Sequence, residues 1–466
     1  MAAFNNVKNK YYKDFTITLE DVSIANALRR ICLANIPNYV MKEDSINIIK
    51  NTSRFNNEII KQRIQCIPVH IIHDSTKTLM YSKYNNDDKD LFSAVHPSEL
   101  TQKDDKDEKI KSLVLKLKME NKSKTSIYAT TKDIQIYDSE DSNEEVKIRR
   151  NGVDLNLSDL VFPPDHITKE HIVIARLKPS IDTSLPGEAI EFTATLSLGT
   201  AKENGSFNVV STCAYENVVD DSLQRNKIEE MKKSNSNFTN DSIEYQNWML
   251  LDGKRENLCH DDKFKFRIET VGVYNNLVIL HKACSIMQEK CTNMISSLES
   301  SSDSIDSVNH KHVTVAQNKN STQTYEYSAT FHNEDYTLGN PLVHYLFSDE
   351  YNKDFIVNIE EEEADVINVE DANKNADESE ATSSKYKMKM SFVGFKVPHP
   401  HIPDGILRII YENSEEGENT ISREHKEAIT KKLVKHTQSI LEDAAEKLKS
   451  EFQNLQKSLT SFEEDK

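Results

Sequence analysis

The sequence predicts an α+β fold in which two related modules are fused in one chain, with a mostly-β domain inserted into the first. Three features support this prediction. A strand followed by a helix occurs near both ends of the chain, each copy is followed by a long helix with heptad spacing, and short alternating strands lie between them. A layout that occurs twice indicates a pseudo-symmetric pair packed on itself, equivalent to a two-fold dimer within one chain.

Composition sets the first limits on function. The 466 residues are 37% hydrophobic and 29% charged, which predicts modest folded domains separated by polar segments. The 58 basic and 76 acidic side chains give a net charge of −18, so direct nucleic-acid binding is not expected to be the main function. No run of about 18 apolar residues occurs, which predicts no membrane-spanning helix, and the first residues lack the apolar core of a signal peptide.

Polar and charged stretches divide the chain into units. The predicted units are a first module at 1–48 and 170–298, an inserted domain at 49–169, a linker at 299–322 and a second module at 323–466. Inside the second module, the acidic stretch 360–384 is predicted to be a disordered insertion. Inside the inserted domain, Asn151-Gly152 between two short alternating runs is typical of a β-hairpin turn.

The first module begins with a strand and a helix. Phe15, Ile17 and Leu19 alternate with polar residues, which is the pattern of a half-buried strand, and the following helix ends before Pro37. The apolar stripe of this helix contains Ile24, Ala27, Leu28 and Ile31. Asn26, Arg29 and Arg30 fall on the opposite face, which on spacing alone is either solvated or a docking surface.

Two long helices are predicted from apolar residues at alternating spacings of three and four. The first contains Leu277, Leu280, Cys284, Met287, Cys291, Met294 and Leu298. The second contains Leu441, Ala445, Leu448, Phe452, Leu455 and Leu459. Stripes of this kind require a partner, so the two helices are candidates for pairing with each other inside the chain. The pattern also allows each helix to pack on its own sheet, or to form a coiled coil between copies of the chain.

The strand–helix opening at residues 15–31 occurs again at residues 327–346. Each copy has an alternating strand, an acidic turn, and a helix in which Asn is followed two residues later by Leu. These pairs are Asn26 with Leu28 and Asn340 with Leu342. Pro341 then lies early in the second helix, where a proline costs no hydrogen bond.

Several segments match a known family. In the first module they are Asn26-Ala27-Leu28-Arg29-Arg30, Ile36-Pro37, FNNEIIKQRIQCIPVHI at 55–71 and HIVIARLKP at 171–179. These resemble the third-largest subunit of eukaryotic RNA polymerase II, the archaeal D subunit and the N-terminal domain of the bacterial α subunit. In that resemblance, the last segment is the strand that re-enters the dimerisation domain.

The second module carries its own motif. Thr337, Leu338, Gly339 and Asn340 open its helix, and GFKVPHPHIPDGILRI at 394–409 contains the run Pro398, His399 and Pro400. These segments resemble the eleventh subunit of the same polymerase and the archaeal L subunit. The histidines suggest a metal site, but with no third ligand nearby a structural loop is favoured.

The resemblance implies a non-catalytic assembly platform. In such polymerases the two related subunits form a heterodimer on which the largest and second-largest subunits are built, together with small polymerase subunits. It further implies that Asn26, Arg29 and Arg30 form an interface to a large subunit, with Arg30 the most important. Contact with DNA is then expected only through the complex, and contact with a membrane is not expected.

Fusion of the two subunits resembles the arrangement in polymerases of large cytoplasmic DNA viruses. The expected location is therefore the cytoplasm of an infected cell and the virion, with the nucleus as the alternative. The Asn- and Lys-rich, Gly-poor composition is compatible with a viral source.

Cofactor and catalytic motifs are not found in the sequence. No cysteine lies between Cys66 and Cys213, where some relatives carry a cysteine cluster or an iron–sulfur domain, so neither a cofactor nor a structural metal is expected. Phosphate-binding, nucleophile and metalloprotease motifs do not occur either. The alternatives to an assembly subunit are an independent enzyme and a viral scaffold or structural protein that oligomerises through its heptad helices.

Overall fold

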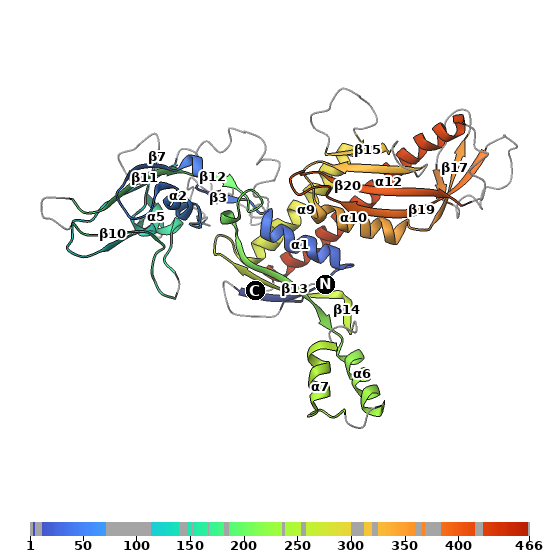
Figure 1. The fold of residues 1–466 in the computed structure, drawn as a ribbon, viewed down its shortest axis with the longest axis horizontal. Helices are drawn as coiled ribbons and strands as arrows, with labels where there is room; N and C mark the ends of the chain where they lie inside the picture. The colour runs from blue at the N-terminus through green and yellow to red at the C-terminus, as the bar shows by residue number, and fades with distance from the viewer. Residues whose placement is uncertain are drawn as a thin grey trace.

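The α+β class predicted from the sequence is confirmed by a computed structural model of the chain (Figure 1). The structure describes residues 3–4, 12–70, 113–138, 147–150, 153–165, 167–180, 186–234, 238–252, 258–299, 312–318, 325–359, 366–368, 384–414 and 423–464. Among these residues, none of the helices has the length and apolar character needed to cross a membrane.

The centre of the molecule is an antiparallel four-stranded sheet with two helices on one face (Figure 1). In spatial order its strands are β1 (Ala3–Phe4), β2 (Tyr12–Thr18), β14 (Cys259–Thr270) and β13 (Val210–Val219). The helices are α1 (Val22–Ala34) and α9 (Asn276–Glu299). The carboxylate of Asp21 accepts from the backbone N–H of Ser23 at 2.7 Å and so caps the first turn of α1. The predicted stripe of α1 is buried against the sheet.

A second sheet has six strands and is likewise covered by two helices. In spatial order the strands are β15 (Val313–Gln317), β16 (Glu326–Phe331), β20 (Gly405–Asn413), β19 (Ser384–Lys396), β17 (Asp354–Ile359) and β18 (Val366–Asn368). The helices are α10 (Tyr336–Asp349) and α12 (Arg423–Glu464). Asp335 caps α10 by accepting from the N–H of Thr337 at 2.8 Å, as Asp21 caps α1.

Two expectations about polar segments differ from the structure. The segment 299–322, predicted to be a linker, contains β15, because Val313 and Val315 can pair with β16 despite their polar surroundings. The acidic segment 360–384, predicted to be disordered, contains β18, which pairs with β17. Residues 360–365 and 369–383 lie outside the described residues.

A separate core lies at one end of the molecule (Figure 1). Its main sheet has, in spatial order, the strands β4 (Asn47–Asn51), β11 (Ala189–Thr195), β5 (Leu113–Glu120) and β7 (Gln135–Asp138). Two smaller sheets have two strands each. In one, β10 (Val173–Leu177) pairs with β6 (Ile127–Thr130), and in the other β12 (Ser197–Gly199) pairs with β3 (Asn38–Val40). The helices α2 (Asn57–Gln65) and α5 (Leu157–Val161) complete it. Strands β8 (Lys147–Arg150) and β9 (Val153–Asn156) pair around the predicted Asn151-Gly152 turn, whose own residues are outside the described ones.

The bounds of this separate core differ from the predicted 49–169. Strands β10 and β11 were predicted to belong to the first module. In the structure β10 pairs with β6, and β11 lies between β4 and β5 and pairs with both. Tyr39 is also buried in this core, so it extends from the β3 strand to the β12 strand. Period-two alternation reveals that a segment is a strand but not which sheet it joins, which explains the difference.

Between β13 and β14 the chain makes a small helical excursion that projects from the body (Figure 1). It contains α6 (Asp221–Ser234), α7 (Ile243–Asn247) and the π-helical turn η6 (Trp248–Asp252). Phe238, Trp248 and Leu258 form its own small core. This excursion lies within the range 170–298 predicted for the first module, and no separate unit was predicted there.

One hydrophobic core joins the four-stranded and six-stranded sheets. It runs without interruption from Phe15 on β2, through Leu298 on α9, to Tyr327 on β16 and Leu459 on α12. The two strand–helix copies are therefore packed on each other. The contact surface between them, here called the junction, is the candidate functional site.

Candidate functional site

The junction begins with Arg30 of α1, whose guanidinium reaches the first turn of α10. Its Nε donates to the hydroxyl of Thr337 at 2.9 Å, and its Nη2 donates to the carboxylate of Asp335 at 2.7 Å. Both ion-pair side chains are 34% exposed. Burial alone would raise the pKa of Asp335, but the hydrogen bonds from Thr337 and the charge of Arg30 outweigh it and lower that pKa. The predicted outer face of α1 is thus partly an internal contact.

A second contact mirrors the first. His344 of α10 lies 3.7 Å from the carboxylate of Asp21, the cap of α1. Arg30 and His344 each lie nine residues after the capping aspartate of their own helix (30 minus 21, and 344 minus 335). Each helix therefore places a basic side chain near its C-terminus against the N-cap of the other, so α1 and α10 run antiparallel about an approximate two-fold axis.

The two heptad helices lie side by side at the same junction. The predicted residues Leu280, Cys284, Met287, Cys291, Leu441, Leu448, Phe452 and Leu455 are all buried in the shared core, and Leu277 packs against it. Gln456 hydrogen-bonds to Ser285 and Gln288, whereas the charge of Lys449 acts on Cys291 and Glu299 acts on Glu442. Higher numbers on α9 therefore meet lower numbers on α12, which means that these helices are antiparallel too.

One ion pair and one hydrogen bond from a lysine reinforce the junction beside the helices. Lys290 on α9 lies 2.5 Å from Glu334 in the turn before α10, and both side chains are largely buried. Lys202, in the loop after β12, donates to the carbonyl oxygen of Asn333 at 3.3 Å. These contacts join the segments 199–298 and 325–349 by charge as well as by apolar packing.

Asn26 and Arg29 remain on the part of α1 that faces away from the apolar stripe. Arg29 donates from Nε and Nη2 to the side-chain oxygen of Asn26, each at 3.0 Å. Both residues are half-buried, and the two hydrogen bonds that join their side chains lie within α1. Their role as a large-subunit interface stays a prediction.

The motif of the second module forms a tight packing cluster. Phe395 is held between Gly339 and Gly405, since a Cβ at either glycine would overlap the phenyl ring. Thr337 and Leu338 are buried, whereas Asn340 is exposed.

The predicted loop residues Pro398, His399 and Pro400 are exposed at the end of β19. The His399 ring accepts at Nδ1 from the N–H of His401 at 3.1 Å, which is a local turn interaction. Among the described residues, no group of three or more His, Cys, Asp or Glu side chains is placed to hold a metal ion. The expectation of no structural metal stays a prediction, to be tested by elemental analysis.

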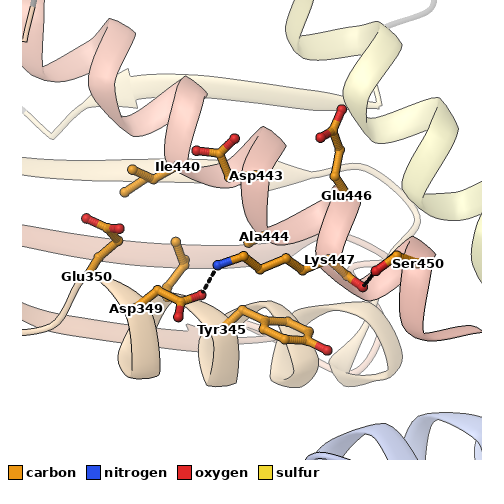
Figure 2. Close-up of a pocket in the computed structure, with 10 residues that line it drawn as sticks. Tyr345, Asp349, Glu350, Ile440, Asp443, Ala444, Glu446, Lys447 and Ser450 are labelled. Atoms are coloured by element: carbon orange, nitrogen blue, oxygen red, sulfur yellow. Dashed lines mark hydrogen bonds and ion pairs between the residues drawn. The ribbon is translucent and has the colours of Figure 1, made fainter.

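A pocket of 420 Å³ opens between α10 and α12, as Figure 2 shows. Its walls include the carboxylates of Asp349, Glu350 and Asp443, and Lys447 pairs with Asp349 at 2.8 Å. Burial raises the pKa of Glu350. The lining has no histidine or cysteine, and the Ser450 hydroxyl donates to the Lys447 carbonyl oxygen, so the pocket offers no activated nucleophile.

Sequence reasoning missed the residues that complete the junction, namely Asp335, His344, Glu334 and Gln456. A signal for two of them was present. Each copy has an acidic cap followed nine residues later by a basic side chain, which aligning the two copies would have revealed. Gln456 has no such signal, because a glutamine beside a heptad position also occurs on solvated faces.

Comparisons with known proteins show which family and which relatives this chain resembles. The family described as the RNA polymerase Rpb3/Rpb11 dimerisation domain matches residues 14–291. The DNA-directed RNA polymerase subunit Rpo3 of Methanosphaera stadtmanae is 23% identical over 301 residues, covering 60% of this chain and 92% of that protein. The human DNA-directed RNA polymerases I and III subunit RPAC1 is 24% identical over 318 residues, covering 61% of this chain and 81% of that protein.

Proposed function

This chain belongs to the RNA polymerase Rpb3/Rpb11 dimerisation-domain family, and on that premise we propose that it is a non-catalytic assembly subunit of a multi-subunit DNA-directed RNA polymerase. The two relatives reported above are named as subunits of such polymerases. The chain's own features agree with a scaffold role, since its best-organised polar contacts hold two parts of the chain together.

In this proposal the chain supplies both halves of the platform itself. The single observation that carries it is the hydrophobic core shared by the four-stranded and six-stranded sheets. The second sheet has its own capped helix α10 and its own long helix α12, in the same order as β2, α1 and α9. The relatives cover about three fifths of the chain, and in this proposal the six-stranded unit is a second subunit-like module fused to an Rpb3-like first one.

The large polymerase subunits are proposed to dock on the part of α1 that the junction leaves accessible. Asn26 and Arg29 lie there, with the Arg29 guanidinium held in place by the Asn26 side chain. A planar guanidinium can bond a carboxylate or backbone carbonyls of a partner with two parallel hydrogen bonds. Arg30 contributes indirectly, because its bond to Asp335 fixes α1 against α10. Small polymerase subunits complete the set of partners.

The setting is proposed to be the cytoplasm of an infected cell, with the nucleus as the alternative. This proposal is supported by the arrangement of two modules in one chain, which resembles the arrangement of the corresponding subunits in polymerases of large cytoplasmic DNA viruses.

Affinity purification of the tagged chain from its native source tests the polymerase assignment. We expect two very large proteins to co-purify with one copy of this chain, together with RNA synthesis on a DNA template. Recovery of homo-oligomers of this chain without large partners would support the scaffold alternative instead.

A further inference from the structure

A polar layer interrupts the apolar contact between α9 and α12. At its centre is Gln456 of α12, which lies between the buried heptad residues Leu455 and Leu459. Opposite it on α9 are His281, Ser285 and Gln288, each one residue after a heptad position.

In this layer each hydrogen-bond donor meets an acceptor. The amide nitrogen of Gln456 lies 2.9 Å from Nδ1 of His281 and donates to the hydroxyl of Ser285 at 2.9 Å. Its amide oxygen accepts from Nε2 of Gln288 at 2.7 Å. The hydroxyl of Ser285 gives its own hydrogen to the carbonyl oxygen of His281 at 3.2 Å, so its lone pairs are available to Gln456. The whole amide is thereby bonded to α9.

His281 has to be neutral for this arrangement, because only an unprotonated Nδ1 can accept from an amide. Its side chain is buried, and this burial, with the charge of the neighbouring Lys282, lowers the pKa of His281 to about 4. At neutral pH the ring is therefore an acceptor at Nδ1, as the geometry with Gln456 requires.

The apolar residues alone do not fix how the two helices align. Helix α12 has 42 residues and α9 has 24, and the heptad positions named above, between 441 and 459 on α12 and between 277 and 298 on α9, are all apolar. A shift by one heptad moves α9 by about 10 Å along α12 and again places apolar residues opposite one another. In such a shift Gln456 would face Thr292 and Ile295 in place of Ser285 and Gln288.

We propose that the layer formed by Gln456, His281, Ser285 and Gln288 sets the register and the partner of the α9–α12 pair. Polar residues at coiled-coil contacts specify alignment and oligomeric state, and here a shift by one heptad would take the half-buried Gln456 amide away from its partners Ser285 and Gln288. The layer makes α12 pair with an α9 helix, and not with a second α12, in one register. This inference rests on the proposed internal pairing of the two units and identifies the residues that make that pairing unique.

The test compares the full chain with a variant in which the layer is apolar, carrying His281→Leu, Ser285→Ala, Gln288→Leu and Gln456→Leu. Both proteins are unfolded in denaturant and refolded at high concentration. Light scattering gives the oligomeric state, and thermal melting gives the stability. Register is read from a disulfide between cysteines introduced as Glu299→Cys and Glu442→Cys, two residues whose charges interact across the native pair. Mass spectrometry identifies the cross-linked peptides.

We expect the apolar variant to melt no lower than the parent, yet to give at least about a tenfold higher ratio of misassembled to native chains, a loss of discrimination of about 1.4 kcal/mol. Misassembled chains appear as dimers or as monomers without the 299–442 cross-link. A matched control, Asn454→Leu on the exposed side of α12, should behave like the parent.

Two results would overturn the inference. One is an apolar variant that refolds to the same monomer with the same cross-link as the parent. The other is a variant that melts far lower while keeping the native register, since the layer would then only stabilise. The proposed internal pairing fails separately, if the parent chain itself purifies as a homodimer with its α9 and α12 paired between copies.

Discussion

Arg30 and Asp335 are 305 residues apart in the chain, and their side chains form an ion pair of 2.7 Å. The pair links the C-terminal part of α1 to the N-cap of α10, and His344 and Asp21 form the matching contact at the other end of the two helices. The two strand–helix units are thus joined at two equivalent positions, by the 2.7 Å ion pair of Arg30 with Asp335 and by the longer 3.7 Å approach of His344 to Asp21. This relationship leads to predictions about stability, acid sensitivity and assembly.

The Arg30–Asp335 contact should contribute measurably to stability. Replacing Arg30 with Met keeps the aliphatic stem, and replacing Asp335 with Asn keeps a helix cap while removing the charge. Because both side chains are about one-third exposed, we expect a coupling of about 0.5 to 1 kcal/mol in a double-mutant cycle measured by denaturant unfolding. Additive effects of the two substitutions would show that the ion pair contributes nothing. The solvated-face interpretation of Arg30 predicts that additive result.

Acid should destabilise the protein between pH 6.5 and about 4. His436 on α12 packs against the ring of Phe355, with centroids 4.3 Å apart, and burial lowers its pKa from 6.5 to about 4. The unfolded chain therefore binds a proton in this window that the folded chain does not, so stability falls as pH decreases through it. The loss is about 3 kcal/mol for this residue.

The variant His436→Phe should flatten that decline. Burial also lowers the pKa of His281 to about 4, so part of the acid sensitivity should remain in the variant. Unfolding free energies of both proteins at several pH values between 4 and 7 measure the difference. An unchanged pH profile would mean that His436 is solvated in the folded protein.

Packing of α12 into the shared core should contribute strongly to the stability of the protein. Phe452 is 1% exposed, so Phe452→Ala should lower the unfolding free energy by about 3–5 kcal/mol. The exposed neighbour Asn454 is the control, and Asn454→Ala should change it by no more than about 0.5 kcal/mol. Chemical denaturation of the full chain measures both. Equal small effects would indicate that α12 does not pack into the core.

Glycine at position 339 should be required for full stability, because the ring of Phe395 occupies the space of a larger side chain. A Cβ at position 339 would overlap the phenyl ring, so Gly339→Ala should cost about 1–3 kcal/mol despite the better helix propensity of alanine. Phe395→Leu should relieve part of this cost, giving a double variant that is more stable than the sum of the single changes predicts. Thermal melting of the four proteins tests this. If the effects of the two substitutions on stability were additive, the cost of Gly339→Ala would not come from contact with Phe395.

Local periodicity correctly predicted helices α1, α9 and α12, although not the shorter helices α5, α6 and α7. The stripe of α1 and the heptads within α9 and α12 are buried where the spacing placed them, because burial of a helix face follows from residues three and four apart. Strand membership was harder to predict. Strand β15 lies in a polar segment, and β10 and β11 join the separate core, since strand pairing depends on residues far along the chain.

The candidate site was predictable in part for the same reason. The stripe of α1 showed that Arg30 lies off the core of its own module, but not that α10 occupies the other side. The partners of Arg30 and Gln456 come from segments more than 100 residues away, and no local pattern encodes such contacts.

Separate expression of the two units tests the internal platform most directly. Residues 1–300 and 312–466 are made as separate chains, with the second boundary placed before β15 because this strand pairs with β16. They are then purified through a tag on the first, and light scattering with native mass spectrometry gives the stoichiometry. The shared core and the contacts of Arg30, His344 and Gln456 predict a stable 1:1 pair. Halves that do not associate, while the intact chain forms homodimers, would contradict the account.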